Sequence, residues 1–271
     1  MPIDPSQLKM PDVSPDGITA MRLIASDNYN MPELCEIISH DPALSATLIK
    51  YANSPRYRQA IEVTNINRAV TVLGVKALGA AIIVASMRTF ISPCEISQQL
   101  WKHSQALSTI SKLLAKRFYP QLAEEIELPA LIHDIGALVL ATNYPNEYRE
   151  IINTAWSPDN SLTLSELENE AFGMTHDEVT SAFITTYRLP EITAQVLANF
   201  HHRLPFIDIQ NNIAAQQTAL INLAHLLEEQ INSHTDHIKE VIPDSMESLL
   251  LHLGLTTDDI ENFIEDYDDS Y

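Results

Sequence analysis

The stretch LPALIHDIGALVLATNY, residues 128–144, is apolar on almost every side of the helix that its length and composition predict. A helix that is apolar all round has to be buried among other elements. Helical periodicity recurs on both sides of it, in QQLWKHSQALSTISKLLAKRF (98–118) and IAAQQTALINLAHLLEEQIN (213–232). The chain has only 6 glycines and little strand-like alternation. We therefore expect an all-α protein with the 128–144 segment in its core.

The N-terminal part of the chain predicts a lobe of shorter helices. We expect them over 18–27, 32–41, 41–54 and 66–90, the last interrupted at Gly74. With 271 residues and 45% hydrophobic content, the chain suits one large domain or two intimate lobes. The predicted divisions are a loosely held lead-in (1–19), an N-terminal helical lobe (20–94), a second helical lobe (95–235), and a C-terminal helical extension with an acidic tail (236–271).

Two helix starts in the second lobe carry polar caps. Ser165 and Glu168 fit the capping box S-x-x-E, and Thr175 precedes a further helix. We expect Glu166 and Glu170 on the helix surface.

The sequence also indicates the cellular compartment of the protein. The sequence contains no run of eighteen apolar residues, so it predicts no transmembrane helix. The first twenty residues lack the apolar core of a secretory signal. Cys35 and Cys94 form no C-x-x-C motif. We expect a cytoplasmic protein with two reduced thiols, and no contact with a membrane.

The net charge of −20 is unevenly distributed. Residues 1–120 carry 12 Lys and Arg against 9 Asp and Glu, whereas residues 121–271 carry 4 against 27. So acidic a molecule repels a phosphate backbone, which argues against nucleic-acid binding. The locally basic stretch 50–117 leaves open an anionic partner, and a nucleic-acid interface there would bind with a steep salt dependence.

Several histidines and one aspartate lie within or beside the apolar helical segments. They are His103, His133 with Asp134, His176, and His201 with His202. Imidazoles and a carboxylate gathered at helix ends are the ligands of a first-row metal or a phosphate-handling site. We expect one site built from several helices, although each histidine alone could be a hydrogen-bonded core residue.

The order of these motifs resembles the HDOD domains, a subgroup of the HD phosphohydrolase superfamily. The residues that carry the resemblance are DPALSATLIKYANSPRY (41–57), AVTVLGVKAL (69–78), WKHS (101–104), LIHDIG (131–136), the segment 166–176, and ANFHH (198–202). The resemblance spans roughly residues 20–205. It implies a bilobal, HD-domain-like helical fold and a place among bacterial signalling proteins, whose partners are other signalling proteins.

The resemblance also implies roles for the site residues. His103 matches the first metal ligand of HD enzymes, His133 and Asp134 match the His-Asp pair, and His176, His201 and His202 match the additional histidines. In catalytic relatives the Asp134 position binds the metal and helps to position the attacking water, so a catalytic role here rests on His133 and Asp134.

The sequence departs from the HD pattern at the last ligand. An Ala-Asp dipeptide is expected there, and the chain has Ala224 followed by His225, with Asn222 one turn away. His225 is a candidate nitrogen ligand, but an imidazole brings no negative charge. A site with Asp134 as its one carboxylate favours Fe, Mn, Ni or Zn over Mg²⁺.

Two functions therefore remain open. The first is a signalling protein that acts through protein–protein contacts and keeps a degenerate His/Asp pocket. The second is a metal-dependent phosphohydrolase acting on a nucleotide or small phosphoester through His103, His133, Asp134, His176 and His202. The oligomeric state stays open in both.

Overall fold

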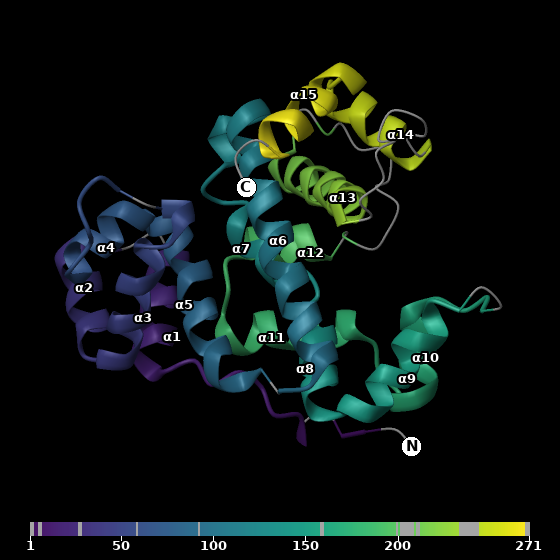
Figure 1. Ribbon diagram of the computed structural model, residues 1–271. Helices are drawn as coiled ribbons and strands as arrows, with labels where there is room; N and C mark the ends of the chain where they lie inside the picture. Colours follow the sequence, from purple (N-terminus) through teal and green to yellow (C-terminus); the bar gives the residue numbers. More distant parts are fainter. Residues whose placement is uncertain are drawn as a thin grey trace. The chain divides into compact units, whose positions relative to one another are not determined.

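The structure is a computed structural model that describes residues 3–4, 7–26, 29–57, 59–91, 93–157, 160–198, 200, 209, 212–232 and 244–268 (Figure 1). Every regular element within these ranges is a helix, and they contain no strand. The prediction of an all-α fold is confirmed. The chain forms two compact units, one of Met1–Ser104 with Leu131–Ala194 and the other of Gln105–Ala130 with Gln195–Tyr271.

The first unit opens with five helices that pack on one another (Figure 1). They are α1 (Pro15–Ala25), α2 (Met31–Ser39), α3 (Pro42–Ala52), α4 (Ile66–Leu73) and α5 (Val75–Phe90), with a 3₁₀ turn at Pro55–Tyr57. The first four begin with polar caps whose side chains accept amide hydrogen bonds: Ser14, Asn30, Asp41 and Asn65. Buried faces of α1, α3 and α4 contact α5, which supplies much of this core.

The predicted break at Gly74 is confirmed. Gly74 separates α4 from α5 and has φ 77°, a backbone conformation that a side chain disfavours. Together α4 and the first part of α5 are apolar enough to resemble a membrane span, but they bend by 113° at this glycine. No single helix within the described ranges is long and apolar enough to cross a bilayer.

The N-terminal lead-in is packed onto the first unit, so the expectation of a loosely held segment is wrong for its described residues. Leu8 and Val13 are buried, and the backbone N–H and C=O of Lys9 both bond the Asn143 side chain. The Tyr187 hydroxyl donates to the Pro11 carbonyl. Prolines prevent helix here but do not prevent docking, and α1 begins at Pro15, earlier than predicted.

Four further helices complete this unit: α8 (Ile135–Asn143), α9 (Pro145–Ala155), α10 (Leu164–Phe172) and α11 (His176–Tyr187). All residues of α8 from Ile135 to Ala141 are buried, as the apolar stretch predicts. Helix α8 packs on α9 and α11, and α10 packs on α9 and α11. The sequence pattern does not predict helix α9.

Three helices cross the boundary between the units in sequence: α6 (Glu95–Phe118), α7 (Glu127–Ile132) and α12 (Glu191–Leu197). The second unit adds a 3₁₀ turn at Pro120–Leu122, α13 (Ile213–Asn232), α14 (Asp244–Leu253) and α15 (Thr257–Asp268). The predicted lobe boundaries at residues 94/95 and 235/236 stay predictions.

Polar contacts hold the second unit together beside its apolar core. The buried Lys112 ammonium lies 2.6 Å from a Glu127 carboxylate oxygen, which offsets the cost of burying both charges. Arg117 on α6 pairs with Asp266 on α15 at 2.5 Å. The Tyr119 hydroxyl donates to the Leu253 carbonyl at the end of α14. The acidic C-terminal segment is therefore helical and anchored as far as Asp268.

Candidate functional site

His133 and Asp134 lie in the turn that joins α7 to α8. The expectation of one continuous helix over 128–144 is wrong at these two residues. Asp134 has φ −112° and ψ 29°, outside the helical range, and α8 starts afresh at Ile135. In a continuous helix consecutive side chains point in different directions, whereas here His133 Nε2 lies 3.2 Å from Asp134 Oδ2. The turn therefore brings the side chains of His133 and Asp134 into contact.

His103, on α6, faces this pair. Its Nε2 lies 3.2 Å from Nε2 of His133, with the ring centroids 5.1 Å apart and the planes at 67°. The His133 side chain is fully buried, and that of Asp134 is 18% exposed. Within the first unit, three predicted ligands thus converge: His103, His133 and Asp134.

Two of the donor-atom separations in this set fit pairs of ligands that share a metal ion. Two ligands each about 2.1 Å from one metal lie about 3.0–3.4 Å apart in octahedral to tetrahedral geometry. The two separations measured here are both 3.2 Å. Two imidazoles and one carboxylate suit Fe, Mn, Ni or Zn, as the sequence predicted. The donor chemistry of these three side chains therefore fits the kind of metal that the HD resemblance implies.

His176 is the first residue of α11 and is held by Glu168 on α10. Glu168 Oε2 lies 2.6 Å from His176 Nδ1 and accepts the His176 backbone N–H at 2.8 Å. Both side chains are buried, with the Glu168 carboxylate fully so. A carboxylate at Nδ1 orients a histidine ring for a ligand at Nε2, and Nε2 of His176 lies 3.7 Å from a carboxylate oxygen of Asp177.

Glu168 and its other partner, Tyr148 on α9, are residues that the sequence reasoning missed. The Tyr148 hydroxyl donates to Glu168 Oε1 at 2.5 Å, and both residues are fully buried. Glu168 was expected in a capping box with Ser165, but the box that caps α10 consists of Thr163 and Glu166. Glu168 is instead one of the two buried residues of its helix, together with Phe172.

A signal for Glu168 was present in the sequence, because a carboxylate four residues before Phe172 falls on the apolar face of the helix. Tyr148 gave no such signal, since an aromatic residue beside Ile151 and Ile152 reads as ordinary core. The expected cap at Thr175 is confirmed, as are the exposed positions of Glu166 and Glu170.

The charges in this cluster shift two pKa values. Burial alone lowers the pKa of His176, but the hydrogen bond and charge of Glu168, with the charges of Asp134 and Asp177, outweigh burial and raise it. The pKa of Tyr148 is raised well above its ordinary value by burial, then by the charges of Glu168 and Asp134. Asp134 therefore acts electrostatically on the Glu168 network as well as contacting His133.

A close helix contact sets the distance between these two groups. The Gly136 N–H, two residues after Asp134, donates to the Thr180 hydroxyl of α11 at 3.1 Å. A Cβ at Gly136 would lie 1.9 Å from the His176 carbonyl oxygen, so only glycine permits this approach. The start of α8 and the start of α11 are thereby fixed side by side.

The other predicted ligands are His201, His202 and His225. His201 and His202 lie outside the described residues. His225 lies on α13 in the second unit, is partly exposed, and has the Phe200 ring 6.5 Å from its own. Its assignment as a ligand stays a prediction.

The first unit thus offers defined chemical roles. His103, His133 and Asp134 would hold a metal ion, and Glu168 orients His176 and caps α11 with its negative charge. A bound metal would polarise a phosphoryl oxygen and lower the pKa of a coordinated water. His176, with its raised pKa, is suited to holding a proton or an anionic oxygen near Asp134.

Comparison with known proteins agrees with these features. Residues 10–204 match the model of the HDOD domain, which covers more than half of the chain. An uncharacterized protein of Treponema pallidum (strain Nichols) is 24% identical over 198 residues, which make up 72% of this chain and 38% of that protein. The chain therefore spans well under half the length of this relative.

Solved structures share the fold. An HDOD domain protein of unknown function from Geobacter sulfurreducens superposes with a TM-score of 0.71 at 21% identity, covering 97% of this chain and 90% of the other. A provisionally assigned phosphohydrolase from Shewanella amazonensis SB2B gives a TM-score of 0.71 at 17% identity, with 97% and 91% covered. At these identities the likeness concerns the fold alone. The match over residues 10–204 shows that the chain belongs to the HDOD domain family.

Proposed function

We propose that this chain is a cytoplasmic bacterial signalling protein. It acts through contacts with other signalling proteins, and its HD-type pocket binds a transition metal and responds to a ligand rather than turning over a substrate. Membership of the HDOD family supports this role. The composition supports the cytoplasmic setting. The strongly acidic net charge disfavours nucleic acid as a partner.

The observation that carries the proposal is the pair of contacts made by the Glu168 carboxylate. Both of its carboxylate oxygens are used, one by Tyr148 and the other by His176. Asp134 is then the carboxylate in contact with His133. A sequence that has His225 where HD enzymes have an aspartate adds no further negative charge. Such a site can hold a divalent cation and an anionic ligand, whereas Glu168, with both oxygens engaged, is not available as a general base.

A phosphoester screen on metal-loaded protein tests the proposal. Wild-type protein reconstituted with Mn²⁺, Fe²⁺, Ni²⁺ or Zn²⁺ is incubated with nucleoside mono-, di- and triphosphates and with a chromogenic phosphodiester. The proposal predicts metal binding without turnover.

Turnover that is lost in His133→Ala and in His103→Ala, but retained in the exposed control His40→Ala, would overturn the proposal. That result would establish the alternative, a metal-dependent phosphohydrolase. The observation that favours the alternative is the 3.2 Å separation of His133 Nε2 from both His103 Nε2 and Asp134 Oδ2, which suits a working metal centre equally well. Melting curves of each variant keep loss of activity separate from loss of fold.

A further inference from the structure

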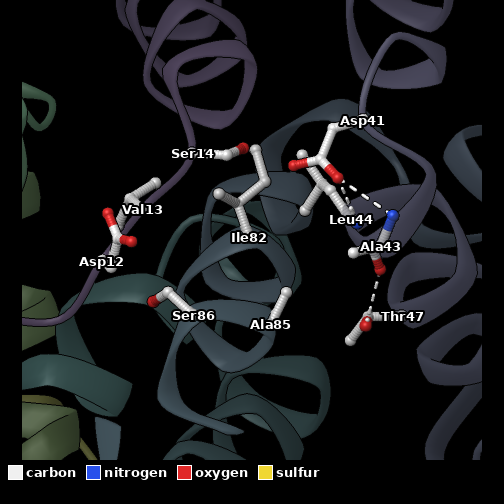
Figure 2. A pocket seen from close by; sticks show the side chains of 10 residues that line it. All are labelled: Asp12, Val13, Ser14, Asp41, Ala43, Leu44, Thr47, Ile82, Ala85 and Ser86. Carbon is white, nitrogen blue, oxygen red and sulfur yellow. Dashed lines mark hydrogen bonds between the residues drawn. The ribbon is translucent and has the colours of Figure 1, made fainter. Parts of the chain in front are cut away.

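A pocket of about 350 Å³ opens in the first unit, and none of the histidine-cluster residues lines it (Figure 2). Its walls come from the lead-in at Asp12–Ser14, the start of α3 at Asp41–Leu44, and the middle of α5. The two helices that flank it, α1 and α3, both pack on α5. The volume is that of a small-molecule site.

The rim of the pocket is negatively charged and rich in oxygen atoms. The Asp12 and Asp41 carboxylates lie on opposite sides of Ile82 in Figure 2, with Ser14 between them and the hydroxyls of Ser86 and Thr47 at the opposite edge of the pocket. None of the described residues that line the pocket is basic. A ligand that complements this rim carries positive charge and hydrogen-bond donors.

Asp41 is fixed in place and ionised at neutral pH. One of its oxygens accepts the amide N–H groups of Ala43 (2.9 Å) and Leu44 (3.0 Å) as the cap of α3. The Leu44 amide, then the Ser14 hydroxyl, lower the pKa of this carboxyl, with a smaller contribution from Ala43. Because the cap determines the side-chain direction, the second oxygen has a defined position.

The floor between the carboxylates is apolar. Val13, Leu44 and Ile82 are buried, and Ala85 completes the surface. The wall behind them is tightly packed, because a Cβ at Gly17 would lie 3.2 Å from side-chain atoms of both Val13 and Ile82. A ligand that fills the pocket therefore needs an apolar middle as well as charged ends.

We propose that this pocket binds a linear aliphatic diamine, with one ammonium group at Asp12, the other at Asp41, and the methylene chain over Ile82 and Ala85. Each ammonium has three N–H donors for the carboxylate and the neighbouring hydroxyl. A monoamine satisfies one end of the pocket and leaves the other carboxylate without its counter-charge, and a neutral diol satisfies neither.

Isothermal titration calorimetry at physiological salt, on the full chain, tests the proposal. The probes are putrescine, butylamine as the monocation of equal chain length, and butanediol as the neutral analogue. We expect saturable one-to-one binding of putrescine, at least about tenfold weaker binding of butylamine, and none of the diol. Asp12→Asn and Asp41→Asn should each weaken putrescine about tenfold, and Ala85→Leu should abolish binding by filling the floor.

Asp16→Asn is the matched control, because Asp16 lies in the first turn of α1 and does not line the pocket. Asparagine at position 41 can still cap α3, so Asp41→Asn is expected to fold, and its melting temperature verifies this. Equal weakening by Asp16→Asn would identify general attraction to an acidic protein and overturn the proposal. Equal affinity for butylamine, or binding that survives Ala85→Leu, would overturn it as well.

Discussion

At the scale of single residues, environment rather than residue type separates the two cysteines. Cys35 is buried in α2, and burial raises the pKa of its thiol. Cys94 precedes α6 and is partly exposed. Burial raises the pKa of the Cys94 thiol, but the backbone amides of Ser97 and Ile96, with Arg149 at 3.8 Å, outweigh burial and lower it.

Iodoacetamide at neutral pH should therefore modify Cys94 several-fold faster than Cys35, because the thiolate is the reacting form. Peptide mass spectrometry over a time course gives both rates. Arg149→Gln should slow Cys94 and leave Cys35 unchanged. Equal rates for the two cysteines in folded protein would contradict the assigned environments.

His176 supplies a pH-dependent contribution to stability. Its pKa is raised in the folded state, so Glu168 stabilises the protonated ring. That contribution is fully present below the unfolded-state pKa of about 6.5 and is lost as pH rises through the folded-state pKa.

Glu168→Gln keeps the size of the side chain but removes its charge. We expect the His176 pKa, measured by NMR titration of the ring, to fall, and the free energy of unfolding to drop by about 1–3 kcal/mol below pH 6. The difference in stability should shrink at higher pH. A His176 pKa that does not move in this variant would show that Glu168 is not its main partner.

At the scale of elements, the sequence predicted regular helices well and their interruptions less well. The break at Gly74 was predictable because glycine changes local backbone preference at that residue. The turn at His133–Asp134 was not, because the flanking residues are all apolar and compatible with helix. What ends α7 there is the packing of α8 against α11 through Gly136, a contact between segments forty residues apart.

Gly136→Ala tests whether this contact positions the site. The added methyl would overlap the His176 carbonyl, so α8 and α11 must separate, at a cost of about 1–3 kcal/mol. We expect a lower melting temperature and weaker metal binding through displacement of His133 and Asp134. Gly254→Ala is the control for a glycine with open space around it, although its φ of 66° carries some backbone strain. If a destabilised Gly136→Ala variant kept its metal affinity, the contact between α8 and α11 would not be what positions His133 and Asp134.

At the scale of the whole molecule, the family was predictable from the order of short motifs. Those motifs hold HDOD-specific residues at fixed spacings, and the family match over residues 10–204 covers nearly the same range. The grouping of polar side chains around His133 and His176 could be predicted only in part, and the assignment of metal ligands stays a prediction. His103, His133 and Asp134 meet in one unit, but Glu168 and Tyr148 take part through tertiary contacts that no local pattern encodes.

Charge is unevenly distributed along the whole sequence, and the negative charge is concentrated after residue 120. The Arg117–Asp266 pair shows basic residues of α6 used to anchor the acidic C-terminal helix. Exposed surface pairs of this kind contribute little to stability. The Arg117–Asp266 pair is therefore expected to add little to the stability of the second unit.

We propose that His103, His133 and Asp134 of the first unit take part in a metal site. The most direct test is metal content by inductively coupled plasma mass spectrometry, on protein purified without chelator or metal-affinity resin. We predict about one equivalent of Fe, Mn, Ni or Zn in wild-type and His40→Ala protein. That metal should be lost in folded His133→Ala and His103→Ala. A well-folded wild-type protein that holds no transition metal, even after reconstitution, would contradict the claim and make the cluster a structural hydrogen-bond network.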